Sequence, residues 1–155
     1  MTIYLDTQKI MDDIRVKSRL AVAGIADPEA RYRAEIGTEK MKEIKAAMST
    51  AYASLVTLVE RFLEPDCRCT EWDDTDEFPD AVRLDLQLSQ RRSGAKPIAL
   101  TSSFHDYMVQ ATMAAVYASG SQADLSAACS NNATGVAQKI VTLLYSKRNP
   151  YITSY

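Results

Sequence analysis

Apolar residues recur every three or four positions from Thr38 to Leu63, which is the spacing of one face of an α-helix. The stripe consists of Met41, Ile44, Met48, Ala51, Leu55, Leu58 and Phe62. From Tyr52 onward a second apolar row joins it, formed by Tyr52, Val56, Val59 and Leu63. The pattern predicts a long helix that is amphipathic at its start and nearly buried all round at its end. Such a helix needs partners in water, so we expect the rest of the chain, or another subunit, to be organised around it.

Two helices are predicted before this one. Asp6 or Thr7 suits the N-cap of the first, because a short oxygen side chain accepts from the free amides of a first turn. Its apolar face is expected to hold Ile10, Ile14 and Ala21, with Met11, Ser18 and Val22 beside them. Gly24 is a suitable end. The run Asp27-Pro28-Glu29 then combines an N-cap, a proline at the first helical position and an acidic first turn, and so predicts a new helix.

Two more helices are predicted after Pro97. Thr101, Ser102 or Ser103 suits the cap of the first, and Gly120 its end. Its expected face is formed by Leu100, Phe104, Tyr107, Met108, Ala111, Ala115 and Ala118, whose small residues favour the close approach of another helix. The face expected for the last helix is formed by Leu125, Ala128, Asn132, Val136, Ile140 and Leu143. Asn131, Asn132 and Gly135 weaken the middle of that helix, so a bend is expected there.

The segment 82–88 allows two interpretations. Apolar residues alternate with polar ones along it, which is typical of a half-buried strand. However, no second strand is evident to pair with it, and an isolated strand leaves its backbone unsatisfied. Pro79 could instead begin a helix that presents Leu84 and Leu88 on one face. A helical or irregular segment is favoured, with a short extended segment as the alternative.

Composition supports one helical domain. The chain has 155 residues, of which 46% are hydrophobic and 25% charged, and its five Gly and five Pro are few for a loop-rich β fold. We therefore predict a mainly α protein, a compact bundle of about five helices spanning 1–155. No apolar run approaches the ~20 residues of a membrane span, and no signal peptide is recognised. The three cysteines are interpreted as reduced thiols of a protein made in the cytoplasm.

Charge divides the chain into unlike segments. Residues 60–80 hold nine acidic residues against two arginines, whereas residues 81–155 hold seven basic residues against three acidic ones. The acidic stretch at 65–80 is interpreted as an exposed loop, and 91–97 as a basic turn. These segments could pair within one molecule or between copies. The candidate partner interface comprises Trp72, Asp73, Asp74, Asp76, Phe78, Arg91, Arg92 and Lys96, since aromatic residues among charges can anchor in a partner's groove.

His105 is the only histidine and therefore the first candidate for catalysis. A triad would draw on Ser102 or Ser103 and on Asp106, but adjacent residues on a helix face different directions, and no nucleophile-elbow motif is present. The sequence thus predicts an ordinary packed or surface histidine and no enzymatic activity.

Three cysteines and the histidine raise the question of zinc. Cys67, Cys69 and Cys129 with His105 would supply four ligands. The spacing of Cys67 and Cys69 is tighter than is usual in zinc sites, and Cys129 lies in the middle of a predicted helix. The acidic loop also lacks the spacing of a calcium-binding loop. We expect no metal and no cofactor.

Four short motifs resemble one protein class. They are Ser89–Lys96 with Arg91, Arg92 and Gly94, then His105-Asp106-Tyr107, then Ser121–Leu125, and finally Leu143–Pro150. With this spacing, residues 80–150 resemble small helical virion proteins of tailed phages and prophages, of the head–tail connector or neck type. The resemblance implies a mostly helical protein that acts as a ring of copies and has no catalytic residues to transfer.

Two hypotheses of function follow. The first is a non-enzymatic structural assembly protein, most sharply a phage head–tail adaptor located in the virion, with itself and other virion proteins such as portal or tail components as partners. The alternative is a helical regulatory or protein-binding module that acts as a monomer or dimer. Neither involves a membrane. The balance of charge does not resemble the basic footprint of a nucleic-acid-binding protein.

Overall fold

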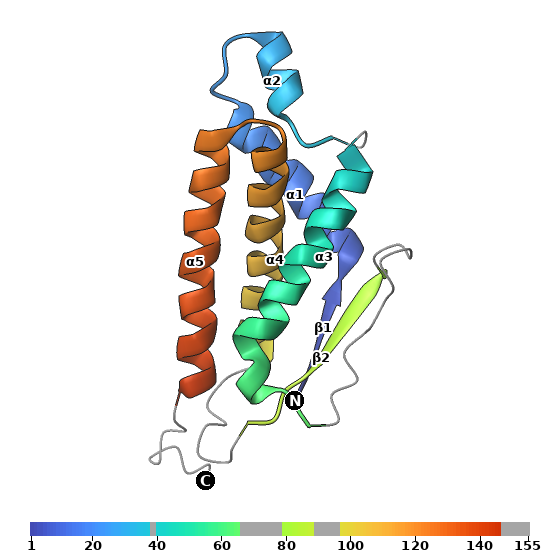
Figure 1. Cartoon of the computed structure of the whole chain (residues 1–155), viewed down its shortest axis with the longest axis vertical. Helices are drawn as coiled ribbons and strands as arrows, with labels where there is room; N and C mark the ends of the chain where they lie inside the picture. The colour runs from blue at the N-terminus through green and yellow to red at the C-terminus, as the bar shows by residue number, and fades with distance from the viewer. Residues whose placement is uncertain (38–39, 66–78, 89–96, 147–155) are drawn as a thin grey trace.

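A computed structural model describes residues 1–37, 40–65, 79–88 and 97–146, and it confirms a mainly helical fold (Figure 1). Within these ranges the chain forms five α-helices, one short 3-10 helix and a two-stranded sheet. In chain order they are β1 (Thr2–Asp6), α1 (Thr7–Val22), α2 (Pro28–Ala34), α3 (Met41–Val59), η2 (Glu60–Phe62), β2 (Ala81–Asp85), α4 (Pro97–Ser119) and α5 (Ala123–Tyr145).

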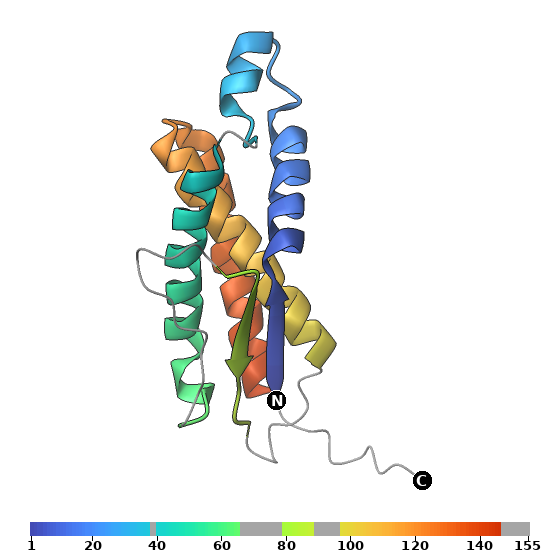
Figure 2. The ribbon, with the colours of Figure 1, turned by 90° about the vertical axis from the view of Figure 1, so that its right-hand side faces the viewer.

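Helix α4 is the centre of the molecule. It packs against α5, α3, α1 and β1, and Figures 1 and 2 show it running through the middle of the bundle. Its buried side chains therefore lie on more than one side of the helix: beyond the predicted Leu100, Phe104 and Met108 they include Val109, Thr112, Met113, Val116 and Tyr117. The expectation that the chain is organised around 38–63 was wrong, because that helix supplies one flank of the core and α4 supplies its middle.

Helix α3 confirms most of the first predicted stripe. Ile44, Met48, Ala51 and Leu55 are buried, and Val59 of the second row is buried with them. Its end is not buried all round, however, since Ala53, Ser54 and Thr57 are exposed. Only the side of α3 that faces α4 and the sheet is covered by the described residues.

The first helix begins and ends close to its sequence signals. The Asp6 carboxylate accepts from the backbone amides of Gln8 (2.9 Å) and Lys9 (3.2 Å), which makes it the N-cap of α1. The predicted face is buried except for Ala21, which is exposed. Ser18 lies on that face and is fully buried, where its hydroxyl accepts from the backbone amide of Ile36 (2.7 Å) and from the hydroxyl of Tyr117 (3.3 Å). One serine thus joins α1, the segment after α2 and α4.

The restart signal is confirmed as well. The Asp27 carboxylate accepts from the amide of Glu29 at 3.1 Å, and Pro28 occupies the first turn of α2. Helix α2 ends at Ala34, before Gly37, so it does not run on into α3. The Arg31 side chain donates to the carbonyl of Ile25 (2.6 Å), closing the connection between α1 and α2.

The favoured interpretation of 82–88 was wrong, because Ala81–Asp85 form strand β2. Its partner is β1, which the sequence analysis did not recognise; the strands are antiparallel, with Tyr4 opposite Arg83 and Ile3 opposite Leu84. One face of the sheet, formed by Ile3, Leu5, Val82, Leu84 and Leu86, is buried against the helices. Thr2, Tyr4 and Arg83 are exposed on the other face, as expected for a sheet covered on one side.

Helices α4 and α5 form a close antiparallel pair. The prediction that small residues allow close approach is confirmed, since the Ser126 hydroxyl of α5 donates to the carbonyl of Ala114 on α4 at 2.8 Å. The buried residues of α5 are Cys129, Ala133, Ile140 and Leu144, so the packed face is turned by about one residue from the predicted one. Helix α5 is continuous through Asn131, Asn132 and Gly135, whose backbone bonds within the helix are kept.

The turn between α4 and α5 differs from its sequence signal. Gly120 donates to the carbonyl of Val116, but the left-handed conformation falls on Ser121, with φ of 60°. The N-cap of α5 is Gln122, whose side chain makes no capping bond. The run Ser121–Asp124 has the sequence pattern of a capping box with Asp in place of Glu, but no side-chain cap of this kind is formed.

Candidate functional site

The residues predicted to form a partner interface lie outside the described part of the chain. Trp72, Asp73, Asp74, Asp76 and Phe78 fall in 66–78, and Arg91, Arg92 and Lys96 fall in 89–96. The structure thus leaves their role as a prediction. What it does place is the backbone from which these two segments begin.

The acidic and basic segments begin from neighbouring backbone. Leu63 pairs with Leu86 in an antiparallel bridge, and the amide of Gln87 donates to the carbonyl of Phe62 at 2.6 Å. The acidic segment 66–78 begins two residues after Glu64, and the basic segment 89–96 begins two residues after Gln87. The ring of Tyr145, at the end of α5, lies edge-on to the ring of Phe62 with centroids 5.1 Å apart. Both charged segments and the segment after α5 therefore leave the fold at one end of the molecule (Figure 1).

His105 has a carboxylate partner that the sequence analysis did not identify. Its Nε2 lies 2.5 Å from Oδ2 of Asp13, so the contact joins α4 to α1. Ser102 is exposed and Ser103 is buried, with no hydrogen-bond partner for the Ser103 hydroxyl within the described residues. The geometry brings His105 to Asp13 rather than to Asp106 or a serine. It provides a contact between two helices.

Of the four candidate zinc ligands, the structure describes Cys129 and His105. Cys129 is buried, and this burial raises the pKa of its thiol. Cys67 and Cys69 lie outside the described residues. Among residues 1–37, 40–65, 79–88 and 97–146, no group of three His, Cys, Asp or Glu side chains is placed to hold a metal ion.

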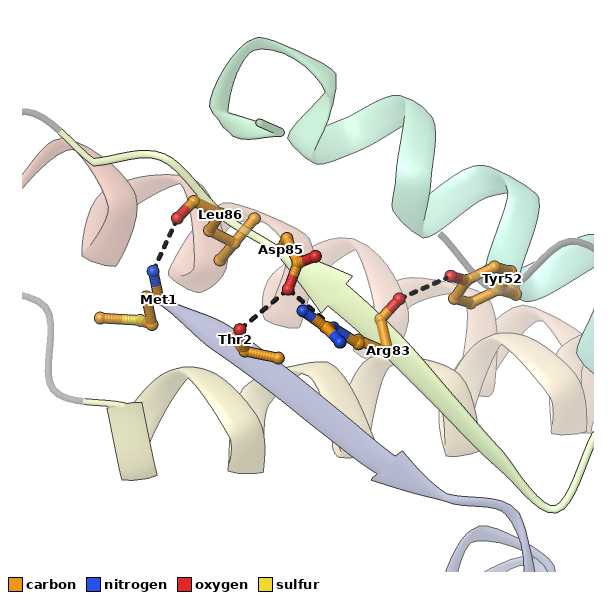
Figure 3. A network of polar contacts seen from close by, with 6 residues as sticks. All are labelled: Met1, Thr2, Tyr52, Arg83, Asp85 and Leu86. Carbon is orange, nitrogen blue, oxygen red and sulfur yellow. Dashed lines mark hydrogen bonds and ion pairs between the residues drawn. The ribbon is translucent and has the colours of Figure 1, made fainter. Parts of the chain in front are cut away.

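Asp85, on the outer face of the sheet, lies at the centre of a polar network (Figure 3). Its Oδ1 accepts from Nε of Arg83 (2.9 Å) and from the hydroxyl of Thr2 (2.8 Å). The hydrogen bond from Arg83, and then that from Thr2, lower the pKa of this carboxyl below its usual 3.8. The Tyr52 hydroxyl donates to the carbonyl of Arg83 at 3.4 Å, which connects β2 to α3. This network fixes β2 between β1 and α3.

Asp85→Asn is expected to lower the melting temperature at neutral pH. The carboxylate binds its partners more strongly when ionised, so its folded-state pKa lies below its unfolded one. A group of this kind stabilises the fold above its unfolded pKa, and that stabilisation is lost as pH falls through the folded pKa. The difference in melting temperature between wild type and Asp85→Asn should therefore shrink from neutral pH toward about pH 3. A difference that is constant over this range would mean that the charge of Asp85 contributes nothing.

One exposed face of helix α5 carries no charge. Residues 125–138 of α5 contain no charged side chain. The exposed side chains in this run are short and uncharged or amide-bearing: Ala127, Ala128, Ser130, Asn131, Asn132, Thr134, Gly135 and Gln138. One side of α5 packs on α4, and at the border of that contact the Asn132 side chain donates to Gln110 at 3.5 Å; the opposite side of α5 lies on the outside of the described part of the molecule (Figure 1). Such a surface allows the backbone of another helix to approach closely.

Exposed apolar side chains lie on the other flank. Val16 (58% exposed) and Leu20 (72% exposed) are one turn apart on α1, and Tyr32 on α2 is 68% exposed. Helix α1 lies on the side of the bundle opposite to α5, as the two views together show (Figures 1 and 2). Unlike surfaces on opposite flanks are what a head-to-tail contact between copies requires.

Comparison of the chain with known protein families, with curated proteins and with solved structures finds no match. None of the helices in the described residues has the length and apolarity needed to cross a membrane.

Proposed function

We propose that this chain is a non-enzymatic structural assembly protein, in its sharpest form a head–tail adaptor or neck component of a tailed-phage virion. Copies of the chain associate in a ring and contact other virion proteins. The observation that carries the proposal is the uncharged exposed face of α5, between residues 125 and 138. In a chain with 25% charged residues, an exposed helix face without charge shares one property of the buried part of protein interfaces, which is depleted in charged residues.

Three further observations support the proposal. Val16 and Leu20 offer an exposed apolar ridge on α1, on the opposite flank, against which short side chains of α5 could pack. The motifs that resemble phage virion proteins include Ser121–Leu125 and part of Leu143–Pro150, which lie at the two ends of α5. The charged segments 66–78 and 89–96 begin at one end of the molecule, where the loop of one copy can meet the turn of the next.

The alternative is a helical binding module that acts as a monomer or dimer. One observation favours it: the Leu63–Leu86 bridge lets the acidic and basic segments begin side by side in one molecule. If they pair within the molecule, their charges are satisfied without a second copy. The test of the proposal must therefore distinguish a contact through the α5 face from a contact through the charged segments.

Thr134→Arg is expected to weaken self-association strongly, because it places a long charged side chain in the middle of the uncharged face. Thr50→Arg on α3 is the matched control, since Thr50 is also an exposed helical threonine, and it should leave association unchanged. Sedimentation velocity over a range of concentrations measures both. Equal association of the two variants would remove α5 from the contact.

Reversal of Arg91 and Arg92 to glutamate gives the second arm of the test. If charges contribute to the contact, association weakens in this variant and also as salt rises, because exposed charges are screened beyond about 8 Å at physiological ionic strength. The monomer's fold should hardly change, since an exposed ion pair contributes only about 0–1 kcal/mol. A monomer at every salt and concentration would contradict the proposal and favour the alternative.

A further inference from the structure

Within the described residues, the two outer edges of the small sheet differ in whether their outward-pointing backbone groups have hydrogen-bond partners. Met1 and Leu86 exchange two backbone hydrogen bonds, and Thr7 donates to the carbonyl of Asp80. In an antiparallel pair, bonded and non-bonded residues alternate. Ile3 and Leu5 therefore bond to β2, while the backbone groups of Thr2, Tyr4 and Asp6 point away from it.

The edge of β2 is covered by its own chain. By the same alternation, the backbone groups of Arg83 and Asp85 point away from β1. The carbonyl of Asp85 accepts from the amide of Glu64 at 3.1 Å, and the carbonyl of Arg83 accepts from the Tyr52 hydroxyl. The edge of β1 is different. No described residue donates to or accepts from the outward backbone groups of Thr2 and Tyr4, and the side chain of Tyr4 is 61% exposed.

Within the described part of the chain, the outer edge of β1 also lacks several features that normally protect a strand from pairing. Its sequence, Thr-Ile-Tyr-Leu-Asp, contains no lysine and no proline, and its register is free of a bulge. Threonine, isoleucine and tyrosine are all strong strand formers. An unprotected edge of this kind is a template for another strand.

We propose that this edge pairs with the same edge of a second copy, which gives a continuous four-stranded sheet in the order β2-β1-β1-β2. The basis is self-complementarity about Tyr4. In an antiparallel pairing centred on Tyr4, that residue faces the partner's Tyr4, Ile3 faces the partner's Leu5, and Thr2 faces the partner's Asp6. Each of these pairs is favourable or neutral, and no like charges lie opposite each other.

The backbone hydrogen bonds and the buried apolar layers of the two copies also match in this pairing. The centre of the pairing falls on Tyr4, which is one of the residues whose amide and carbonyl point outward, so the two copies exchange two backbone bonds there. The carbonyl of each Thr2 meets the amide of the partner's Asp6. Ile3 and Leu5 remain on the buried side and Tyr4 on the exposed side, so the apolar layer of each copy continues across the contact. The contact is two-fold and isologous.

This pair goes beyond the ring proposed above and uses a different surface. It closes after two copies, whereas the α5 contact continues head to tail. It also rests on backbone hydrogen bonds rather than on ion pairs, so the pair should persist in about 1 M salt, where charges are screened within about 3 Å. Thr134→Arg should weaken the ring and leave the pair intact, whereas substitution of Tyr4 should do the reverse, so a failure of the ring and a failure of the pair are seen separately.

Tyr4→Pro in the full chain tests the proposal. Proline removes the Tyr4 amide hydrogen that points away from β2, and all bonds between β1 and β2 are kept. Association of the pair, measured by sedimentation velocity in high salt, should become at least about tenfold weaker. Tyr4→Phe keeps both the amide and the ring and should associate like wild type. Circular dichroism checks that each variant is folded.

A second variant guards against misfolding of the proline variant. Tyr4→Lys keeps the amide but places like charges opposite each other across the two-fold axis, and an exposed lysine is well tolerated on a strand edge. It should also dissociate the pair, and more completely at low salt than at high salt. A wild-type chain that is monomeric in high salt at every concentration overturns the proposal. A pair unaffected by both Tyr4→Pro and Tyr4→Lys overturns it as well, because another surface then makes the contact.

Discussion

Replacing Leu55 by aspartate is expected to abolish the folded state. Leu55 has no exposed surface and lies in the buried face of α3, between Ala51 and Val59. An unpaired carboxylate there must be buried or protonated at a cost of several kcal/mol, in addition to the lost packing of the leucine. Since small domains unfold with about 5–15 kcal/mol, this single change removes most or all of the stability. Circular dichroism and thermal melting measure the loss.

The matched control is Leu20→Asp. It is the same chemical change on a helix, but Leu20 is 72% exposed on α1, so the carboxylate stays in water. Its melting temperature should lie close to that of wild type, because surface substitutions usually change stability by no more than about 0.5 kcal/mol. Similar melting temperatures for Leu55→Asp and Leu20→Asp would contradict the core described above.

Phe104→Ala is expected to have the second largest effect, a loss of about 3–5 kcal/mol in the free energy of unfolding. Phe104 is fully buried on α4, the helix that contacts α1, α3, α5 and β1. A cavity at this place cannot be closed by the movement of one neighbour, because four elements meet around the helix. Urea denaturation measures the loss from the midpoint at constant slope.

Ile98→Ala provides the comparison on the same helix. Ile98 is 85% exposed, near the start of α4, so truncation should cost well under 1 kcal/mol. If Phe104→Ala and Ile98→Ala destabilise equally, then α4 is not the central helix of the fold.

The helices were predictable because their signals are local. Asp6, Asp27 and Pro28 mark helix starts through bonds that span two or three residues, and the three-four spacing of α3 fixes its buried side. These features depend on the backbone geometry of a single helix. They do not depend on what packs against it.

The sheet could not be predicted with the same certainty, because its two strands lie far apart in the sequence. Ile3 and Leu5 alternate with Thr2, Tyr4 and Asp6, which is a strand pattern, but five residues at the start of a chain are a weak signal alone. Pairing of Ile3 with Leu84 supplies what each segment lacks. Once the alternation at 82–88 was noticed, a search for a second alternating run would have found this partner.

Long-range packing explains the other differences between the predicted and the observed structure. The face of α5 is turned because α4 meets it along Cys129, Ala133 and Ile140, and the sequence of α5 alone cannot show from which side α4 approaches. The contact of His105 with Asp13 joins residues 92 positions apart and has no sequence motif. The uncharged run of α5 was visible in the sequence, but its meaning depends on knowing that those residues are exposed.

Native mass spectrometry of the full chain tests the central claim, assembly from copies, most directly. A ring predicts one dominant closed species with a fixed number of copies above two, which Thr134→Arg reduces to smaller species while Thr50→Arg leaves it intact. A chain that is only a monomer at every concentration would contradict assembly altogether. A chain that stops at two copies would contradict the ring and leave a dimeric binding module as the function.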